Sequence, residues 1–216
     1  MVGLTSWQAL KGRANLKPGQ KVFIPAGAGG IGTFAIQLAK YLGARVGTTT
    51  STGNVDLVRS LGADEVIDYK KQQFEDVLRD YDAVLGTVRG DAIEKALQIL
   101  KTKSTVVSLI GPPDAAFGRA RDMNFFMVFM FGLLSRKIIR RAKKCGVEYS
   151  FLFVHPDGCQ LAEIGELLES GRIRPVIDRV FPFDQAKDAL AYLDNGRAKG
   201  KVVVQMEMMS QFSLGS

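Results

Sequence analysis

The chain has 216 residues, 46% of them hydrophobic and 24% charged, which is typical of a soluble globular protein with one or two domains and a sizeable core. Its net charge is +7, and much of this charge lies in the basic run 136–144; no nucleic-acid-binding motif accompanies the run, which favours a solvated helix face over a nucleic-acid partner. The only histidine is His155 and the only cysteines are Cys145 and Cys159, which argues against a His/Cys zinc site, a disulfide framework and, without a G-x-S-x-G elbow, a Ser-His-Asp hydrolase.

A glycine-rich turn joins the first predicted strand, 21–25, to a predicted helix near 30–42. In this turn Gly27, Gly29 and Gly32 fit the G-x-G-x-x-G pattern of a dinucleotide site. Gly27 would allow the tight turn, Gly29 would let the backbone approach a pyrophosphate, and Gly32 would let helix and strand pack closely. N–H groups at the start of the helix would hold the phosphates. The alternative is a Gly-rich turn with no ligand.

The second predicted strand, 45–49, ends in a stretch without carboxylates. An NAD site usually has Asp or Glu about 20 residues after the glycines, where it binds the ribose 2′-OH. The stretch here holds hydroxyls, a glycine and an amide: Thr50, Ser51, Thr52, Gly53 and Asn54. Because none of these would repel a 2′-phosphate, NADP(H) is favoured over NAD(H). The alternative is a β-branched strand that simply runs into a turn.

The rest of the first 177 residues alternates between strands and helices. The further strands are predicted at 65–68, 82–86, 104–110 and 148–154, and the further helices near 54–61, 73–79, 91–100 and 157–170. This alternation predicts an α/β fold with a parallel sheet covered on both faces. Six strands match a complete doubly wound, Rossmann-type domain.

Two regions depart from this alternation. The apolar stretch 123–134, which precedes the basic run, is too short to span a bilayer. It is apolar all round, which favours a helix covered by protein over amphipathic attachment to a membrane. Residues 178–205 read as strand, helix and strand after the sheet is complete. We therefore expect a cofactor domain at 1–177, part of a second domain at 178–205 and a tail at 206–216.

With these motifs placed, four segments, 3–10, 26–32, 61–69 and 196–204, give the chain a family resemblance. They resemble the leading helix, the glycine turn, the third-strand signature and the C-terminal strand of the zinc-independent, quinone oxidoreductase-like branch of the medium-chain dehydrogenase/reductase superfamily. In that family a GroES-like catalytic domain precedes the leading helix. The resemblance thus implies a cofactor-binding portion that lacks this domain, with 178–205 as the return into it.

The resemblance also implies cofactor contacts. The turn with Ser51, Thr52 and Asn54, together with Tyr69, would surround the 2′-phosphate, although relatives often carry a lysine in this turn. Backbone at Gly30 and Ile31 would meet the pyrophosphate. The remaining contacts are Ile110, Gly111, Phe151 and Phe153 beside the nicotinamide, and Lys199 close to the cofactor.

These observations predict an NADPH-dependent oxidoreductase that reduces a quinone or an α,β-unsaturated carbonyl, with no catalytic residue assigned and no metal. The rival function is a non-catalytic module that holds NADPH as a sensor or scaffold. We expect a small-molecule substrate, no nucleic-acid or membrane partner, and a homodimer or an oligomer formed through the exposed edge of strand 201–205. Without a secretory signal at the N-terminus, a cytoplasmic location is expected.

Overall fold

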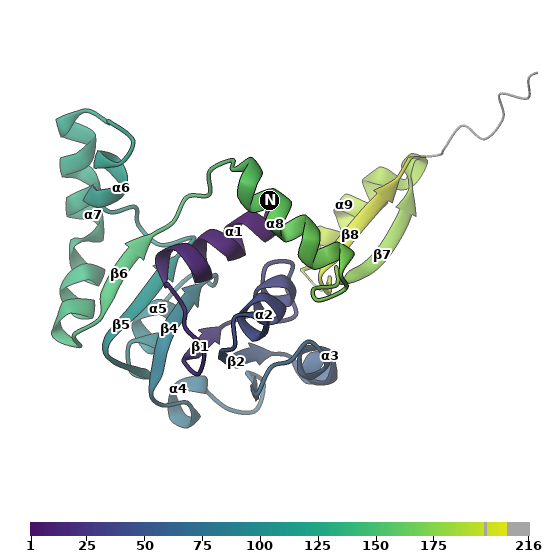
Figure 1. Cartoon of the computed structure of the whole chain (residues 1–216), viewed down its shortest axis with the longest axis horizontal. Coiled ribbons are helices and arrows are strands. Elements are labelled where there is room, and N and C mark those ends of the chain that lie inside the picture. Colours follow the sequence, from purple (N-terminus) through teal and green to yellow (C-terminus); the bar gives the residue numbers. More distant parts are fainter. Residues whose placement is uncertain (197, 207–216) are drawn as a thin grey trace, which may run out of the picture.

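Six parallel strands form the main sheet of the computed structural model, which describes residues 1–196 and 198–206. The strands are β1 (Lys21–Ile24), β2 (Arg45–Thr50), β3 (Glu65–Asp68), β4 (Tyr81–Gly86), β5 (Leu100–Ser108) and β6 (Glu148–Phe151). Their order is β3-β2-β1-β4-β5-β6, so the winding reverses between β1 and β4 (Figure 1). This confirms the predicted doubly wound α/β fold.

The two faces of the sheet are covered by different helices. On one face lie α1 (Val2–Trp7), the π-helix η1 (Gln8–Arg13), α2 (Gly32–Tyr41), α3 (Val55–Ser60) and α8 (Gly158–Glu169); on the other lie α5 (Ala92–Ala96), α7 (Phe125–Lys144) and the short α4 (Phe74–Val77). Successive side chains of β1 pack on opposite faces of the sheet. Val22 and Ile24 belong to the first core cluster and Phe23 to the second. The run is continuously apolar because both of its faces are buried.

The region between β4 and β5 differs from the sequence-based prediction. The helix expected near 91–100 ends at Ala96, and β5 begins at Leu100. Leu100 pairs with Tyr81 at the start of β4, and the ladder shifts register before it continues. The buried Tyr81 ring holds this end of the sheet, packing edge-on against Phe23 with ring centroids 6.1 Å apart. The extra strand pairing therefore shortens the helix.

The apolar stretch forms the first part of helix α7 and is largely exposed, so the expectation that protein covers it is wrong. Its N-cap residue Asn124 accepts a hydrogen bond from the N–H of Met127, but the turns that follow project past the sheet (Figure 1). The helix α6 (Ala115–Arg119) packs against only one side of them, with the Phe117 and Phe131 rings 5.9 Å apart. On the other side Phe125 is 84% exposed. Within the described residues, α7 included, no helix has the length and apolar character needed to cross a membrane.

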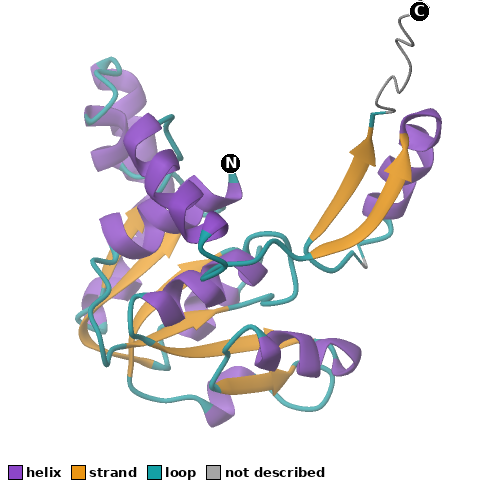
Figure 2. Ribbon diagram, turned by 45° about the vertical axis from the view of Figure 1, so that its right-hand side comes forward, coloured by secondary structure: helices purple, strands orange, loops and turns teal. Residues whose placement is uncertain are grey.

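The C-terminal elements form a second, smaller sheet. Strands β7 (Ile177–Pro182) and β8 (Lys201–Gln205) pair in parallel, joined by η3 (Phe183–Gln185) and α9 (Ala186–Asp194). This pair stands apart from the main sheet (Figure 2). It meets the turn after β1, where the Gly200 N–H donates to the Ala28 carbonyl at 2.9 Å. The strand–helix–strand pattern predicted for 178–205 is therefore present, and 206–216 lies, apart from Met206, outside the described residues.

Candidate functional site

The glycine turn between β1 and α2 is held by β2. Ala26 adopts a left-handed conformation with φ of 54°, and its N–H donates to Thr49 Oγ1 at 3.1 Å. The next N–H, that of Gly27, donates to the Thr49 carbonyl at 2.9 Å. A non-glycine residue in this conformation is costly and persists only where its surroundings fix it. Two bonds to one strand residue supply that support.

The three motif glycines meet different surroundings. A Cβ on Gly32 would lie 2.5 Å from the Ala26 carbonyl oxygen and 2.7 Å from the Gly27 Cα, and one on Gly27 would collide with the Thr48 side chain. A Cβ on Gly29 would meet only the Ala26 carbonyl oxygen, at 3.2 Å. Packing within the fold therefore requires glycine at positions 27 and 32, whereas position 29 has almost enough room for a side chain.

A cleft of about 700 Å³ opens beside Gly29, within the size range of small-molecule sites. It lies at the carboxyl ends of β1, β2 and β3, where ligands bind in open α/β sheets. Its lining residues are Ala26, Ala28, Gly29, Thr50, Ser51, Gly53, Asn54, Tyr69, Lys70, Gly196, Ala198 and Lys199.

This cleft gathers part of the predicted cofactor site. Six of the predicted residues line it: Gly29, Thr50, Ser51, Asn54, Tyr69 and Lys199. Gly27, Gly30, Ile31 and Gly32 lie in the adjoining turn and at the start of α2. The side chain of Thr52 instead donates to Asp68 at 2.6 Å.

The residues predicted beside the nicotinamide lie elsewhere. Ile110 and Gly111 line a separate cavity after β5. Phe151 packs edge-on against Phe117, with ring centroids 5.1 Å apart. Phe153 lines a third hollow, next to Trp7. The residues predicted around the adenosine phosphate therefore lie together in this chain, whereas the residues predicted around the nicotinamide lie apart from one another.

The charges around the cleft favour an anion. Lys70 and Lys199 line it, and none of its lining residues, all within the described part of the chain, is acidic. The nearby carboxylate of Asp68 already accepts bonds from Thr52 Oγ1 and from the Lys70 N–H at 3.1 Å. The bond from Thr52 is the largest of the causes that hold the pKa of Asp68 below its ordinary value. Asp68 is thus ionised and already engaged in hydrogen bonds.

Two lysines near the cleft were not predicted from the sequence. Lys70 follows β3 and lines the cleft. Lys201 reaches the glycine turn from β8, because a Cβ on Gly30 would lie 2.5 Å from its Nζ. Burial lowers the pKa of Lys201, and among the described residues it makes no ion pair. The hydrogen bond from Gly200 to Ala28 lies next to it and joins positions far apart in the sequence.

Comparison with known proteins now identifies the family. Residues 61–204 match the family model described as "Zinc-binding dehydrogenase". The residues present do not fit a metal, since within 1–196 and 198–206 no group of three or more His, Cys, Asp or Glu side chains could hold one.

Individual relatives agree with this match. The chain is 35% identical over 217 residues to the mitochondrial NAD(P)H oxidoreductase RTN4IP1 of Danio rerio, covering 95% of this chain and 55% of that protein. It is 33% identical over 199 residues to the chloroplastic NADPH-dependent alkenal/one oxidoreductase of Arabidopsis thaliana, covering 89% and 42%. The structure of a quinone oxidoreductase from Coxiella burnetii superposes with a TM-score of 0.79 at 30% identity, covering 96% of this chain and 59% of that one.

The chain spans about half the length of the curated relatives it matches. The first of these relatives is mitochondrial by name, and a cytoplasmic location for this chain stays a prediction. The predicted resemblance is confirmed: the chain belongs to the zinc-binding dehydrogenase family, in the quinone oxidoreductase-like branch of the medium-chain dehydrogenases/reductases, and it covers their C-terminal, cofactor-binding part.

Proposed function

We propose that the cleft at the glycine turn binds NADPH, and that the whole protein uses it to reduce a quinone or an α,β-unsaturated carbonyl. One observation carries the proposal: Gly29 borders the cleft, and an added Cβ would meet only the Ala26 carbonyl oxygen, at 3.2 Å, so packing demands glycine far less here than at Gly27 or Gly32. A glycine that packing demands so little is explained by a ligand that must approach the backbone closely.

The pyrophosphate would lie against the start of α2. Backbone N–H groups of Gly30 and Ile31 would donate to it, and the ammonium group of Lys201 beside Gly30 would supply the opposite charge. A half-buried lysine without a carboxylate partner is unfavourable in the empty protein. A bound phosphate would remove that cost, which supports an anionic ligand at this position.

The 2′-phosphate is the part that distinguishes NADPH from NADH. Ser51, Asn54 and Tyr69 would surround it, and Lys70 and Lys199 would neutralise it. The carboxylate that an NAD site needs is missing from the cleft lining, and Asp68 is engaged by Thr52. These contacts support a preference for NADPH.

The bound cofactor would supply the hydride, and this chain would hold and orient it. The substrate class rests on the named activities of the relatives, which act on quinones and on alkenals and alkenones. No proton donor is assigned to a residue of this chain.

We further propose a cofactor domain at 1–177, a second unit at 178–205, and self-association through the open edge of β8.

Calorimetric titration of the chain with NADPH and NADH tests the proposal. NADPH should bind more tightly, and Gly29→Val should abolish measurable binding while leaving the circular dichroism spectrum unchanged. The matched control is Gly165→Val on α8, where an added Cβ meets nothing within 4 Å. Normal NADPH binding by a folded Gly29→Val variant would refute the site, and equal affinities would refute the preference.

The rival function is a module that binds NADPH and transfers no hydride. The dispersal of Ile110 and Phe153 into separate cavities favours it for the chain by itself. NADPH oxidation with a panel of quinones and enones separates the two. Turnover with any of them supports the enzyme, and binding without turnover, in this chain and in the whole protein, supports the module.

A further inference from the structure

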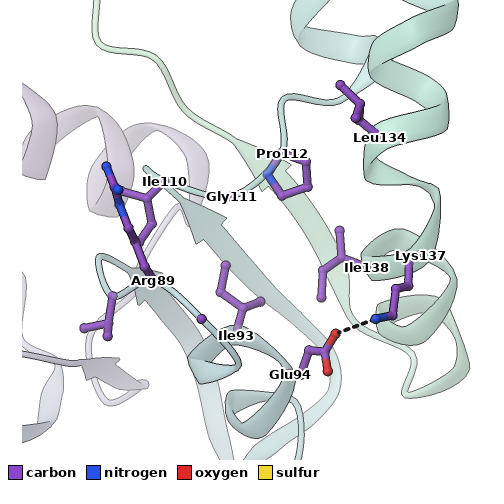
Figure 3. Close-up of a pocket in the computed structure, with 11 residues that line it drawn as sticks. Arg89, Ile93, Glu94, Ile110, Gly111, Pro112, Leu134, Lys137 and Ile138 are labelled. Carbon is purple, nitrogen blue, oxygen red and sulfur yellow. Dashed lines mark ion pairs between the residues drawn. The ribbon is translucent and has the colours of Figure 1, made fainter.

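We propose that a second cavity in this chain binds a medium-chain fatty carboxylate, with the carboxylate at Arg89 and the alkyl chain running across the cavity toward Leu134 on α7. The cavity has a volume of about 280 Å³ and lies on the α5 and α7 side of the sheet, after β4 and β5. Figure 3 shows Arg89 and Lys137 on opposite sides of it, with Ile93 and Ile138 between them. It is separate from the cleft at the glycine turn, with which it shares no lining residue.

The charges around the cavity leave an excess of cations. Glu94 is its acidic lining residue, and it pairs with Lys137, Nζ to Oε1 at 3.8 Å, and also with Arg141. Arg89 makes no ion pair among the described residues. One carboxylate therefore faces three cations. A planar guanidinium pairs with a carboxylate through two parallel hydrogen bonds, which makes Arg89 a fitting anchor.

The walls between these cations are apolar and firmly held. Ile93 and Ile138 are each 8% exposed and belong to the core. The loop after β5 is fixed at two points: the Gly111 N–H donates to Ser108 Oγ at 2.8 Å, and the Tyr149 hydroxyl donates to the Pro112 carbonyl at 2.9 Å. A preformed pocket with an apolar wall and convergent polar groups is the usual form of a small-molecule site.

An exposed apolar stripe continues from the cavity. Leu134 lines the cavity and is 57% exposed. Met130 and Phe126, one and two turns earlier on the same face of α7, are 36% and 66% exposed. Eight residues of helix span roughly 12 Å. An alkyl chain of about ten carbons extends over a similar length, so with its carboxylate at Arg89 it would pass Ile93 and Ile138 inside the cavity, and its last methylenes would reach the stripe at Leu134.

Calorimetric titration of the full chain with sodium hexanoate, decanoate and the neutral decanol tests this proposal. Decanoate is kept below its micelle-forming concentration, and no nucleotide is added, so the result is independent of the NADPH proposal. Each methylene that reaches the stripe should tighten binding about two- to fourfold. Decanoate should therefore bind at least about tenfold more tightly than hexanoate, and decanol should bind weakly.

Four variants locate the ligand. Arg89→Gln should weaken decanoate binding about tenfold, and Leu134→Ser should remove most of the advantage of decanoate over hexanoate. Glu94→Gln should tighten binding, because it removes a negative charge from the cavity lining that repels the ligand's carboxylate. Lys143→Gln, which neutralises an exposed lysine of α7 outside the cavity, should leave binding unchanged.

The proposal is overturned if decanoate gives no saturable heat, or if Lys143→Gln weakens binding as much as Arg89→Gln. It is also overturned if size-exclusion chromatography shows a dimer that Leu134→Ser converts to a monomer, and decanoate does not bind that dimer.

Discussion

The carboxyl edge of the main sheet has two unlike halves. After β1, β2 and β3, backbone hydrogen bonds and glycine contacts shape one cleft, which gathers six of the predicted cofactor residues. After β4, β5 and β6, side chains define separate cavities, and the predicted nicotinamide contacts are distributed among them. The first half presents six of its predicted contacts around one cleft, whereas the second half does not bring its predicted contacts together. The next four experiments test this difference.

The largest expected effect is on folding. Gly32→Val should lower the free energy of unfolding by about 3 kcal/mol, because the new side chain meets Ala26 and Gly27 backbone that cannot move away. Gly29→Val should cost less than about 1 kcal/mol. Urea denaturation of both variants measures the difference. Equal losses would show that the two glycines are alike and that Gly29 has a structural purpose.

The next effect is on cofactor affinity. Lys201→Met should weaken NADPH binding about tenfold. Burial lowers the pKa of Lys201, so the cation is lost at a lower pH than for an ordinary lysine. Affinity in the parent chain should therefore fall as the pH rises through this lowered pKa, and the Lys201→Met variant should not show that fall. Titrations from neutral to alkaline pH check this; parallel pH profiles would remove Lys201 from the site.

Cofactor preference should respond to a single charge. Ser51→Asp should shift the ratio of NADPH to NADH affinity toward NADH by about tenfold, because the new carboxylate repels the 2′-phosphate and accepts from the 2′-OH. Ser51→Asn is the neutral control of similar size. An unchanged ratio in the Asp variant would place the ribose away from the turn after β2.

The smallest effect is expected on the other half of the edge. Phe153→Ala should change the NADPH affinity of this chain by less than about twofold, because Phe153 lies in a hollow with Trp7, away from the cleft. Competition titration against the parent chain has the precision required. A tenfold loss would mean that the second half closes on the cofactor without any other domain.

Sequence reasoning succeeded where a local pattern determines the backbone. The apolar runs predicted the six strands of the main sheet, and the spacing of Gly27, Gly29 and Gly32 predicted the turn. It also predicted the strand–helix–strand order of the C-terminal unit.

It failed where contacts distant in sequence decide the outcome. The pairing of Leu100 with Tyr81 shortened a predicted helix. The Lys201 contact depends on a hydrogen bond across 172 positions, from Gly200 to Ala28. The apolar half of α7 was predicted to be covered by protein because its residues are hydrophobic. Its exposure depends instead on which elements lie next to the helix, and the sequence pattern does not contain that information.

That Gly200–Ala28 hydrogen bond has a dynamic consequence. It joins the glycine turn to the strand that carries Lys201, so the small sheet cannot swing away without releasing the Gly200 amide hydrogen to solvent. A ligand that contacts both the glycine turn and Lys201 would bind only the arrangement in which the two are joined. Binding would therefore raise the population of that arrangement by mass action. The exchange rate of one amide proton then reports how often the two parts of the chain separate.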